Sequence, residues 1–138
     1  MRPSTSNPFS IWVPLEPRPA SRPIVSRYGT RYGKKHMQYQ ADFVKWIEEI
    51  RNETEWPTIN KELCSTQLEF VATKARTSKL HTPNFDIDNA CKLILDCWTS
   101  SGLIWTDDKQ VVTLCASKRF ATPEEASGTF FSVWLEEE

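Results

Sequence analysis

The sequence lacks the features that mark several large protein classes. No apolar run approaches the roughly 20 residues of a membrane-spanning helix, so we expect no membrane segment. The N-terminus, "MRPSTSNPFSIWVPLEP", has no continuous apolar stretch of the secretory kind. There is no internal repeat, and the acidic end at residues 136–138 is the only low-complexity stretch. These absences indicate a single globular domain over residues 1–138, which is long enough to bury a core.

Cysteine and histidine are few, and their spacing does not suit a metal site. The four cysteines form no CxxC pair, and His36 and His81 have no metal-binding spacing. Cys91 and Cys97 lie six residues apart within a predicted helix, which is a poor separation for a disulfide. We therefore expect reduced, mostly buried thiols in a reducing cytoplasm.

The small net charge of −1 hides an uneven distribution along the chain. Residues 1–41 hold seven Lys or Arg and one acid, Glu16, so this part carries about +6 and the remainder about −7. The basic residues concentrate in a loop at 16–36. Such a split predicts a basic surface for a polyanion beside an acidic cluster with another purpose.

Periodicity and turn residues predict an α+β fold with a mixed β-sheet and two main helices packed on one face. Prolines bracket an edge strand at 8–15, and a loop or irregular hairpin follows. The expected elements after it are a helix at 37–52, a strand at 65–76, a helix at 89–101 that ends at Gly102, a turn at 106–109 leading into a strand, and a last strand at 128–136.

Residues 85–111 contain five aspartates and, within the predicted helix, Lys92, and each has an ordinary structural explanation. Asp88 could be the N-cap of the second helix, and Asp86 could favour the helix dipole. Lys92 stands four residues after Asp88, a spacing that allows a weak ion pair of about 0.3–0.5 kcal/mol. The "TDDK" sequence is a common turn signal, because aspartate bonds its own backbone in turns.

Taken together, the carboxylates favour a metal site. Asp86 and Asp88 are spaced i, i+2 on an expected extended approach to the helix, which directs both side chains to one side. If the chain reverses after the helix, Asp107 and Asp108 come near them. Carboxylates about 6 Å apart repel by about 3 kcal/mol at an effective dielectric of about 20, so such a cluster is tolerable if a divalent cation neutralises it or if some carboxylates are protonated. All-oxygen ligands favour Mg²⁺ or Mn²⁺, and Lys92, one turn after Asp88, would point into the site.

The stretch "FDIDNACKLILDCWTSSGLIWTDDKQV" resembles the RusA family of Holliday-junction resolvases. The family signature is approximately D-x-D-N-x-x-K-x-x-x-D, followed by a glycine and D-D-x-Q-V. The matching positions are Asp86, Asp88, Asn89, Lys92, Asp96, Gly102, Asp107, Asp108, Gln110 and Val111. The upstream "PRPASRPIVSRYGTRYGKK" is similar to the basic N-terminal region of the family, and the resemblance covers roughly residues 9–135.

The resemblance implies a small homodimeric, Mg²⁺-dependent endodeoxyribonuclease that cuts four-way DNA junctions by paired nicks, in DNA recombination and repair. It would be cytoplasmic and encoded by a bacterium or a phage. Asp86, Asp88 and Asp108 would be the metal-binding catalytic aspartates, with Lys92 as the catalytic lysine. Asp107 would be an accessory acid that also binds the metal, and Asp96 would have a supporting role.

The basic loop supplies cations that suit phosphate contacts, which position a nucleic acid without reading its sequence. The predicted DNA-binding residues are Arg18, Arg22, Arg27, Arg31, Lys34 and Lys35. Tyr28 and Tyr32 alternate with these arginines and could stack on bases at a branch point or pack against the first helix. Two other functions stay open: a non-catalytic branched-DNA-binding module, and a metal-dependent phosphohydrolase of a small substrate.

Overall fold

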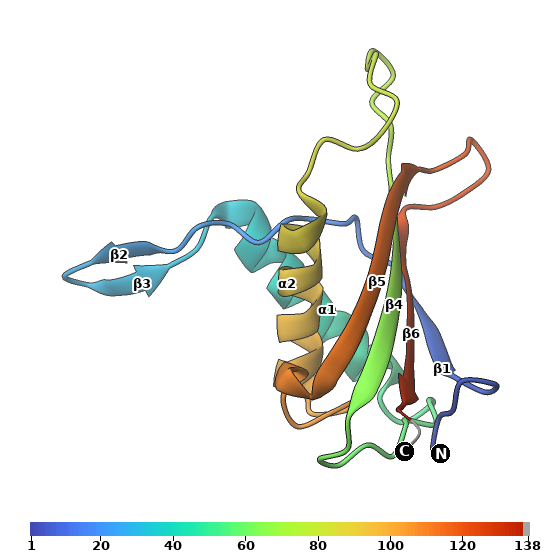
Figure 1. Cartoon of the computed structure of the whole chain (residues 1–138). Coiled ribbons are helices and arrows are strands. Elements are labelled where there is room, and N and C mark those ends of the chain that lie inside the picture. Colours follow the sequence, from blue (N-terminus) through green and yellow to red (C-terminus); the bar gives the residue numbers. More distant parts are fainter. Residues whose placement is uncertain (137–138) are drawn as a thin grey trace.

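The computed structural model describes residues 1–136, in which two helices cover one face of a mixed four-stranded sheet (Figure 1). The sheet order is β1-β6-β4-β5. Strands β4 and β5 are parallel and are joined through helix α2, whereas the other neighbours are antiparallel. The elements are β1 Phe9–Val13, β2 Ile24–Ser26, β3 Gly29–Arg31, α1 Lys34–Ile50, β4 Cys64–Ala72, α2 Ile87–Ser101, the 3₁₀ turn η1 Asp108–Gln110, β5 Val111–Phe120 and β6 Gly128–Leu135. The predicted α+β class is confirmed.

The core lies between the helices and the sheet, with Trp98 of α2 at its centre. The Trp98 ring is fully buried and lies 4.9 Å from Phe43 of α1 and 5.1 Å from Phe131 of β6, centroid to centroid. Trp46 and Trp56 complete the aromatic cluster at 5.9 and 6.0 Å from Trp98. Aromatic side chains remove a large apolar area from water, so this cluster fixes how both helices sit on the sheet.

Several predicted boundaries differ from the structure by one to four residues. Helix α1 begins at Lys34 rather than at residue 37, and the sequence did not reveal this start because Lys34 and Lys35 are exposed and carry no apolar pattern. Helix α2 begins at Ile87, two residues early, with Asp86 as its N-cap. Strand β4 ends at Ala72 rather than at residue 76, because the N–H of Thr73 bonds the Glu16 carboxylate at 3.1 Å instead of a neighbouring strand.

Two glycines have clear structural reasons. Gly102 ends α2 in the left-handed region at φ 68°, as the sequence predicts. Gly128 starts β6 where the Trp12 ring crosses the strand, and a Cβ there would lie only 2.3 Å from that ring. Trp12 packs on Phe130 at 4.6 Å and closes part of the outer sheet face.

The cysteine prediction is confirmed for the described residues: all four thiols are free, and Cys64, Cys91 and Cys97 are buried. Burial raises the pKa of Cys64 and of Cys91 to about 11. Cys115 is exposed on β5. No helix in residues 1–136 has the length and hydropathy needed to cross a membrane.

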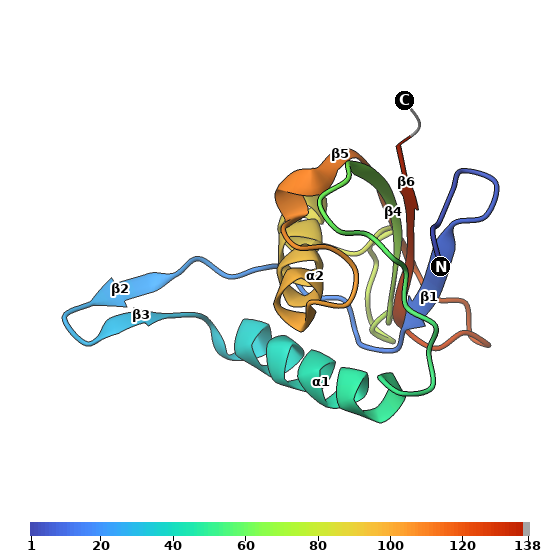
Figure 2. The same cartoon turned by 90° about the horizontal axis from the view of Figure 1, so that it is seen from below.

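The predicted loop or hairpin at 16–36 forms an arm, which we define as residues 22–32. Its strands β2 and β3 pair only with each other, and they extend away from the helices and the main sheet (Figure 2). Every residue of the arm is exposed. At its base, the Ser21 hydroxyl accepts the Gly33 N–H at 2.7 Å and the Ser21 N–H donates to His36 Nδ1 at 3.0 Å.

Candidate active site

Helix α2 presents a row of charged side chains to solvent. Asp88, Lys92 and Asp96 are spaced by four residues and are all exposed, so they share one face of the helix. The opposite face carries Leu93, Ile94 and other core residues. The sequence therefore directs the charged stripe outward simply by burying the apolar side.

Asp86 and Asp88 occupy the start of α2, in a different arrangement from the expected one. Asp86, not Asp88, is the N-cap, and its carbonyl accepts the Ala90 N–H at 3.1 Å. Its carboxylate makes no capping bond but accepts from the Asn89 amide at 3.4 Å. Asp88 lies in the first helical turn, so the two residues do not share the extended geometry that was predicted.

The ion pair that the spacing of Asp88 and Lys92 would allow is absent from the part of the chain that the structure describes. Both carboxylates at the start of α2 are exposed. Their negative charges are stabilised by the positive end of the helix dipole, and their oxygens remain available to a cation or a ligand.

Lys118 of β5 ties this end of α2 to the sheet. Its ammonium donates to the Phe85 carbonyl oxygen at 2.7 Å and lies 5.4 Å from the centre of the Phe85 ring. Phe85 in turn packs edge-on against Phe70 of β4 at 5.9 Å. The sequence gives no sign of this role of Lys118, because no local pattern reveals a lysine that bonds a backbone 33 residues away.

Asp107 and Asp108 follow the other end of α2 and have different surroundings. The Asp107 carboxylate caps η1 by accepting the Lys109 N–H at 2.9 Å, and the Gln110 side chain accepts the Asp107 N–H in return. Gln110 also donates to the carbonyl oxygens of Asn60 and Glu62, both at 2.9 Å. The turn explanation of "TDDK" therefore holds for Asp107.

The Asp108 side chain is partly buried, and the bond that caps η1 is made by Asp107 and not by Asp108. Burial raises the pKa of its carboxyl, and the negative charges of Asp96 and Asp107 raise it further. The charge of Asp96, the last charged residue of the α2 stripe, therefore acts on Asp108. Carboxylates held together in this way are stabilised by a bound cation.

The two acidic groups lie at opposite ends of α2 in a single chain (Figure 1). A helix of 15 residues is about 22 Å long at 1.5 Å per residue, so Asp86 and Asp88 are far from Asp107 and Asp108. Within residues 1–136, no three His, Cys, Asp or Glu side chains come together to hold a metal. The expectation that the chain reversal joins them is wrong for one chain, because η1 turns directly beneath the end of the helix.

His36 is a second residue whose place the sequence did not reveal. It is buried and stacks on Tyr32 with ring centres 4.3 Å apart, and the charges of Lys92 and Asp96 act on it. Burial lowers the pKa of its imidazole, the Asp96 charge opposes this, and Lys92 adds to it. A neutral imidazole whose Nδ1 accepts the Ser21 N–H joins the base of the arm to the charged face of α2.

The basic residues lie mainly on the arm and at the start of α1. Arg22, Arg27, Arg31, Lys34 and Lys35 are exposed, and Arg18 is half-buried. Lys34 and Lys35 occupy the first turn of α1, where no acidic residue is present. The helix dipole disfavours cations there by about 0.3–1 kcal/mol each, so this placement is not explained by stability.

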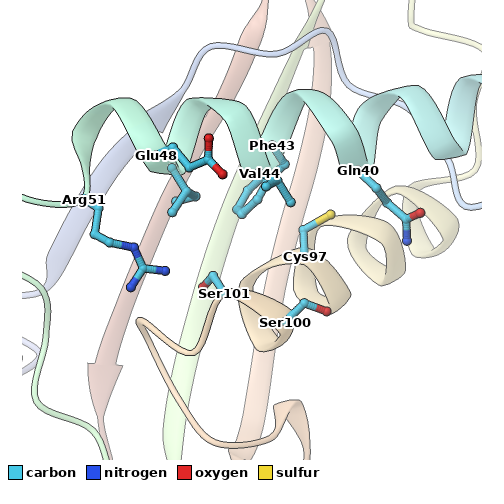
Figure 3. Close-up of a pocket in the computed structure, with 9 residues that line it drawn as sticks. Gln40, Phe43, Val44, Glu48, Arg51, Cys97, Ser100 and Ser101 are labelled. Carbon is cyan, nitrogen blue, oxygen red and sulfur yellow. The ribbon is translucent and has the colours of Figure 1, made fainter.

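A pocket of about 310 Å³ lies between α1 and the C-terminal half of α2 and is separate from this chemistry (Figure 3). Its lining is Gln40, Phe43, Val44, Ile47, Glu48, Arg51, Cys97, Ser100 and Ser101. None of the aspartates discussed above contributes to it. The candidate site is therefore the open surface of α2 and η1, which suits an extended substrate better than an enclosed small molecule.

Comparison with known proteins bears on this surface directly. The model of the family described as Endodeoxyribonuclease RusA matches residues 14–125, which include the arm, α2, η1 and β5. The chain belongs to the RusA family. No curated protein matches the chain. Membership in the RusA family confirms the resemblance seen in the sequence and makes the chain an endodeoxyribonuclease of the Holliday-junction resolvase type, with DNA as its partner.

Proposed function

We propose that this RusA-family chain resolves four-way DNA junctions by Mg²⁺-dependent paired nicks, acts as a homodimer, and serves DNA recombination and repair. The single observation that carries the proposal is the pairing of an exposed Asp86, Asp88 and Lys92 surface with a strongly basic arm in one chain of this family. A small-molecule phosphohydrolase has no use for the arm. A pure binding module has no use for the carboxylates.

The proposed chemistry uses the charged groups of α2 and η1. Asp86, Asp88 and Asp108 offer only carboxylate oxygens, the ligands that Mg²⁺ prefers, and Mn²⁺ fits the same set. Bound there, the ion would neutralise the carboxylates and polarise the scissile phosphate. One carboxylate oxygen of Asp107 accepts the bond that caps the turn, so at most its other oxygen would bind the metal. Lys92, one turn after Asp88, would stabilise the charge that develops on the phosphate as water attacks phosphorus.

Water supplies the oxygen of the new 5′-phosphate, and the bond from phosphorus to the 3′ oxygen breaks, which leaves a 3′-hydroxyl; this polarity follows the family. Asp96 is placed between Lys92 and Asp108 along the helix surface. We propose that it orients these groups through its charge, as a positioning residue. The exposed position of the whole stripe leaves room for a duplex to lie across it.

A homodimer would complete the site that one chain leaves divided. Strand β5 forms an edge of the sheet, is ten residues long, and exposes Val112 and Leu114. Its first seven residues, "VVTLCAS", carry no charge of the kind that usually protects an edge strand from pairing. Antiparallel pairing of β5 with β5 of a second copy would bury these side chains and extend the sheet across a two-fold axis.

The same pairing would bring the two acidic groups together. If Val112 pairs with Leu114 of the second copy, Thr113 lies on the two-fold axis, and the start of each β5 lies beside the end of the other. Asp108 then approaches the level of Lys118 in the second copy. Because Lys118 holds Phe85 next to Asp86, each Asp108 would come toward the start of α2 in the other chain.

The deciding experiment incubates the purified chain with a labelled four-way junction and with linear duplex, with Mg²⁺ and with EDTA. The proposal expects symmetric nicks on the junction alone, dependent on the metal and absent in Asp88→Asn. Asp42→Asn, an exposed carboxylate on α1, is the matched control and should cut normally. Tight binding without any cutting would instead identify a DNA-binding module, and cutting by Asp88→Asn at the normal rate would refute the site.

A further inference from the structure

The arm ends in a two-residue loop made of Arg27 and Tyr28. Ser26 and Gly29 form the last pair of β2 and β3, and Gly29 has φ 112°, a conformation that favours glycine. The Ser26 hydroxyl accepts the Tyr28 N–H at 3.2 Å and donates to the Gly29 carbonyl at 3.5 Å. The turn therefore holds one arginine and one tyrosine at the point of the molecule farthest along the arm (Figure 2).

Tyr28 and Tyr32 have different roles, although the sequence treats them alike. Tyr32 stacks on His36 with the ring planes 14° apart, so its ring is part of the base of the arm. Tyr28 is 84% exposed, against 38% for Tyr32. The fold uses the ring of Tyr32 and leaves the ring of Tyr28 free for a partner.

Arg27 holds the Tyr28 ring and adds charge to it. The guanidinium carbon lies 4.9 Å from the ring centre, and Nη2 donates to the phenol oxygen at 2.8 Å. This contact pairs a cation with an aromatic face at the tip. An aromatic ring and a guanidinium side by side can bind a base by stacking and a phosphate by charge at the same time.

The rest of the arm indicates that its partner is a polyanion. No acidic residue occurs from Pro17 to Ala41, whereas this stretch contains six lysines and arginines. A two-stranded hairpin with no third strand is only marginally stable in water, so ordering on a partner is expected. Ile24 and Val25 are 49% and 75% exposed, and a second copy of the chain could cover them, but two equally basic arms would repel each other.

We propose that Tyr28, supported by Arg27, stacks on a base at the branch point of a DNA junction and thereby supplies selectivity for branched over linear DNA. The inference rests on the proposed function and assigns recognition of the branch to the arm, separately from cleavage on α2. In a linear duplex every base is covered by its neighbours. At a branch point the stacking is interrupted, so a base face becomes available to the tyrosine.

The test compares binding of an immobile four-way junction and a linear duplex in EDTA, so that no cleavage occurs, for the full chain and its variants. Tyr28→Ala should weaken junction binding by roughly tenfold and leave duplex binding unchanged. Tyr28→Trp should retain the junction preference, because it keeps a stacking ring. Thr30→Ala, at a residue that is also exposed on the same hairpin, is the matched control and should behave as the unchanged protein.

A fluorescent base analogue, 2-aminopurine, at the branch point reports stacking directly. Its emission should be quenched by the unchanged protein and by Tyr28→Trp, and not by Tyr28→Ala. Equal loss of junction and duplex binding in Tyr28→Ala, or an unchanged ratio, would overturn the inference. If Tyr28→Ala changes the molecular mass of the protein in solution and leaves the ratio of junction to duplex binding unchanged, the tip of the arm contacts a second copy of the chain. This result would also overturn the inference.

The two proposals fail in different ways. If the unchanged protein cuts junctions and Tyr28→Ala keeps the full junction preference, the inference is wrong and the proposed function stands. If the unchanged protein never cuts but quenches the branch-point analogue through Tyr28, the proposed catalysis is wrong and the recognition by Tyr28 stands. If it neither cuts nor prefers junctions, both are wrong.

Discussion

The ammonium group of Lys118 bonds the Phe85 carbonyl oxygen at 2.7 Å, and this contact connects the end of β5 to the residue before Asp86. Lys118→Met keeps the length of the side chain and removes the donor. We expect about 1 kcal/mol less free energy of unfolding and a roughly tenfold lower cleavage rate, with junction affinity unchanged. Chemical denaturation and single-turnover cleavage measure these. Lys79→Met, in the exposed loop before α2, is the control, and equal rates for both variants would contradict the positioning role.

Substitutions of the two adjacent aspartates at the start of η1, Asp107 and Asp108, should have separate effects on stability and on catalysis. Asp107→Ala removes the cap of the turn and should cost about 1 kcal/mol of stability, whereas Asp107→Asn keeps an acceptor and should cost less. Asp108→Asn should abolish cleavage without destabilising the protein. Thermal unfolding and junction nicking of the three variants check this, and a catalytic loss confined to Asp107→Asn would reverse the assignment.

The pH dependence of Asp108→Asn follows from the raised pKa of this carboxyl. Folding then favours the protonated acid, so the unmodified protein loses stability as pH rises from the unfolded value of 3.8 through the higher folded pKa. The variant lacks this loss. Without metal, Asp108→Asn should therefore be more stable than the unmodified protein at neutral pH, and the advantage should vanish below about pH 3.8. An advantage that is the same at all pH values would contradict the assignment.

A shared site predicts complementation between two inactive variants. If each site joins the start of α2 in one chain with Asp108 of the other, co-folding Asp88→Asn with Asp108→Asn leaves one intact site per mixed dimer. Single nicks on the junction should return. Co-folding Asp88→Asn with Asp86→Asn is the control, because both changes lie at the same end of α2 and no intact site forms. A mixture of Asp88→Asn and Asp108→Asn that stays inactive, although mixed dimers form, would place the site within one chain.

The role of the β5 edge in dimerisation can be tested by measuring the molecular mass of the protein in solution. Leu114→Lys adds a charge to the exposed apolar pair and should convert the proposed dimer into monomers, since a charged edge strand opposes pairing. Cleavage should fall with it. Leu80→Lys, at a similarly exposed leucine in the loop before α2, is the control, and light scattering measures both. A Leu114→Lys protein that stays dimeric and active would place the interface elsewhere.

The first turn of α1 predicts opposite effects on binding and on stability. Lys34→Gln with Lys35→Gln should lower the slope of log affinity against log salt by about 0.9 per lost phosphate contact. The same change should raise stability by about 0.3–1 kcal/mol per residue, because it relieves the helix dipole. Lys45→Gln, exposed on the same helix, should leave both unchanged. A salt slope unaffected by the double change would remove the two lysines from the DNA surface.

The sequence by itself determined the class of the fold and the identity of the charged residues. Apolar spacing predicted both helices because a helix buries one face, and Gly102 marked the end of α2 because only glycine readily adopts its conformation. Asp86, Asp88, Lys92 and Asp108 were visible because their residue types at this spacing resemble the signature of the RusA family, whose model matches residues 14–125.

Only the tertiary structure decided how these residues meet. The sequence does not encode which end of α2 the next turn reaches, so it could not show that the charge of Asp96 acts on Asp108 or that Asp108 lies far from Asp86. It could not separate Tyr28 from Tyr32, because stacking on His36 depends on how the base of the arm packs. Nor could it reveal the Lys118–Phe85 bond. These relationships are contacts between distant segments, and local pattern carries no information about them.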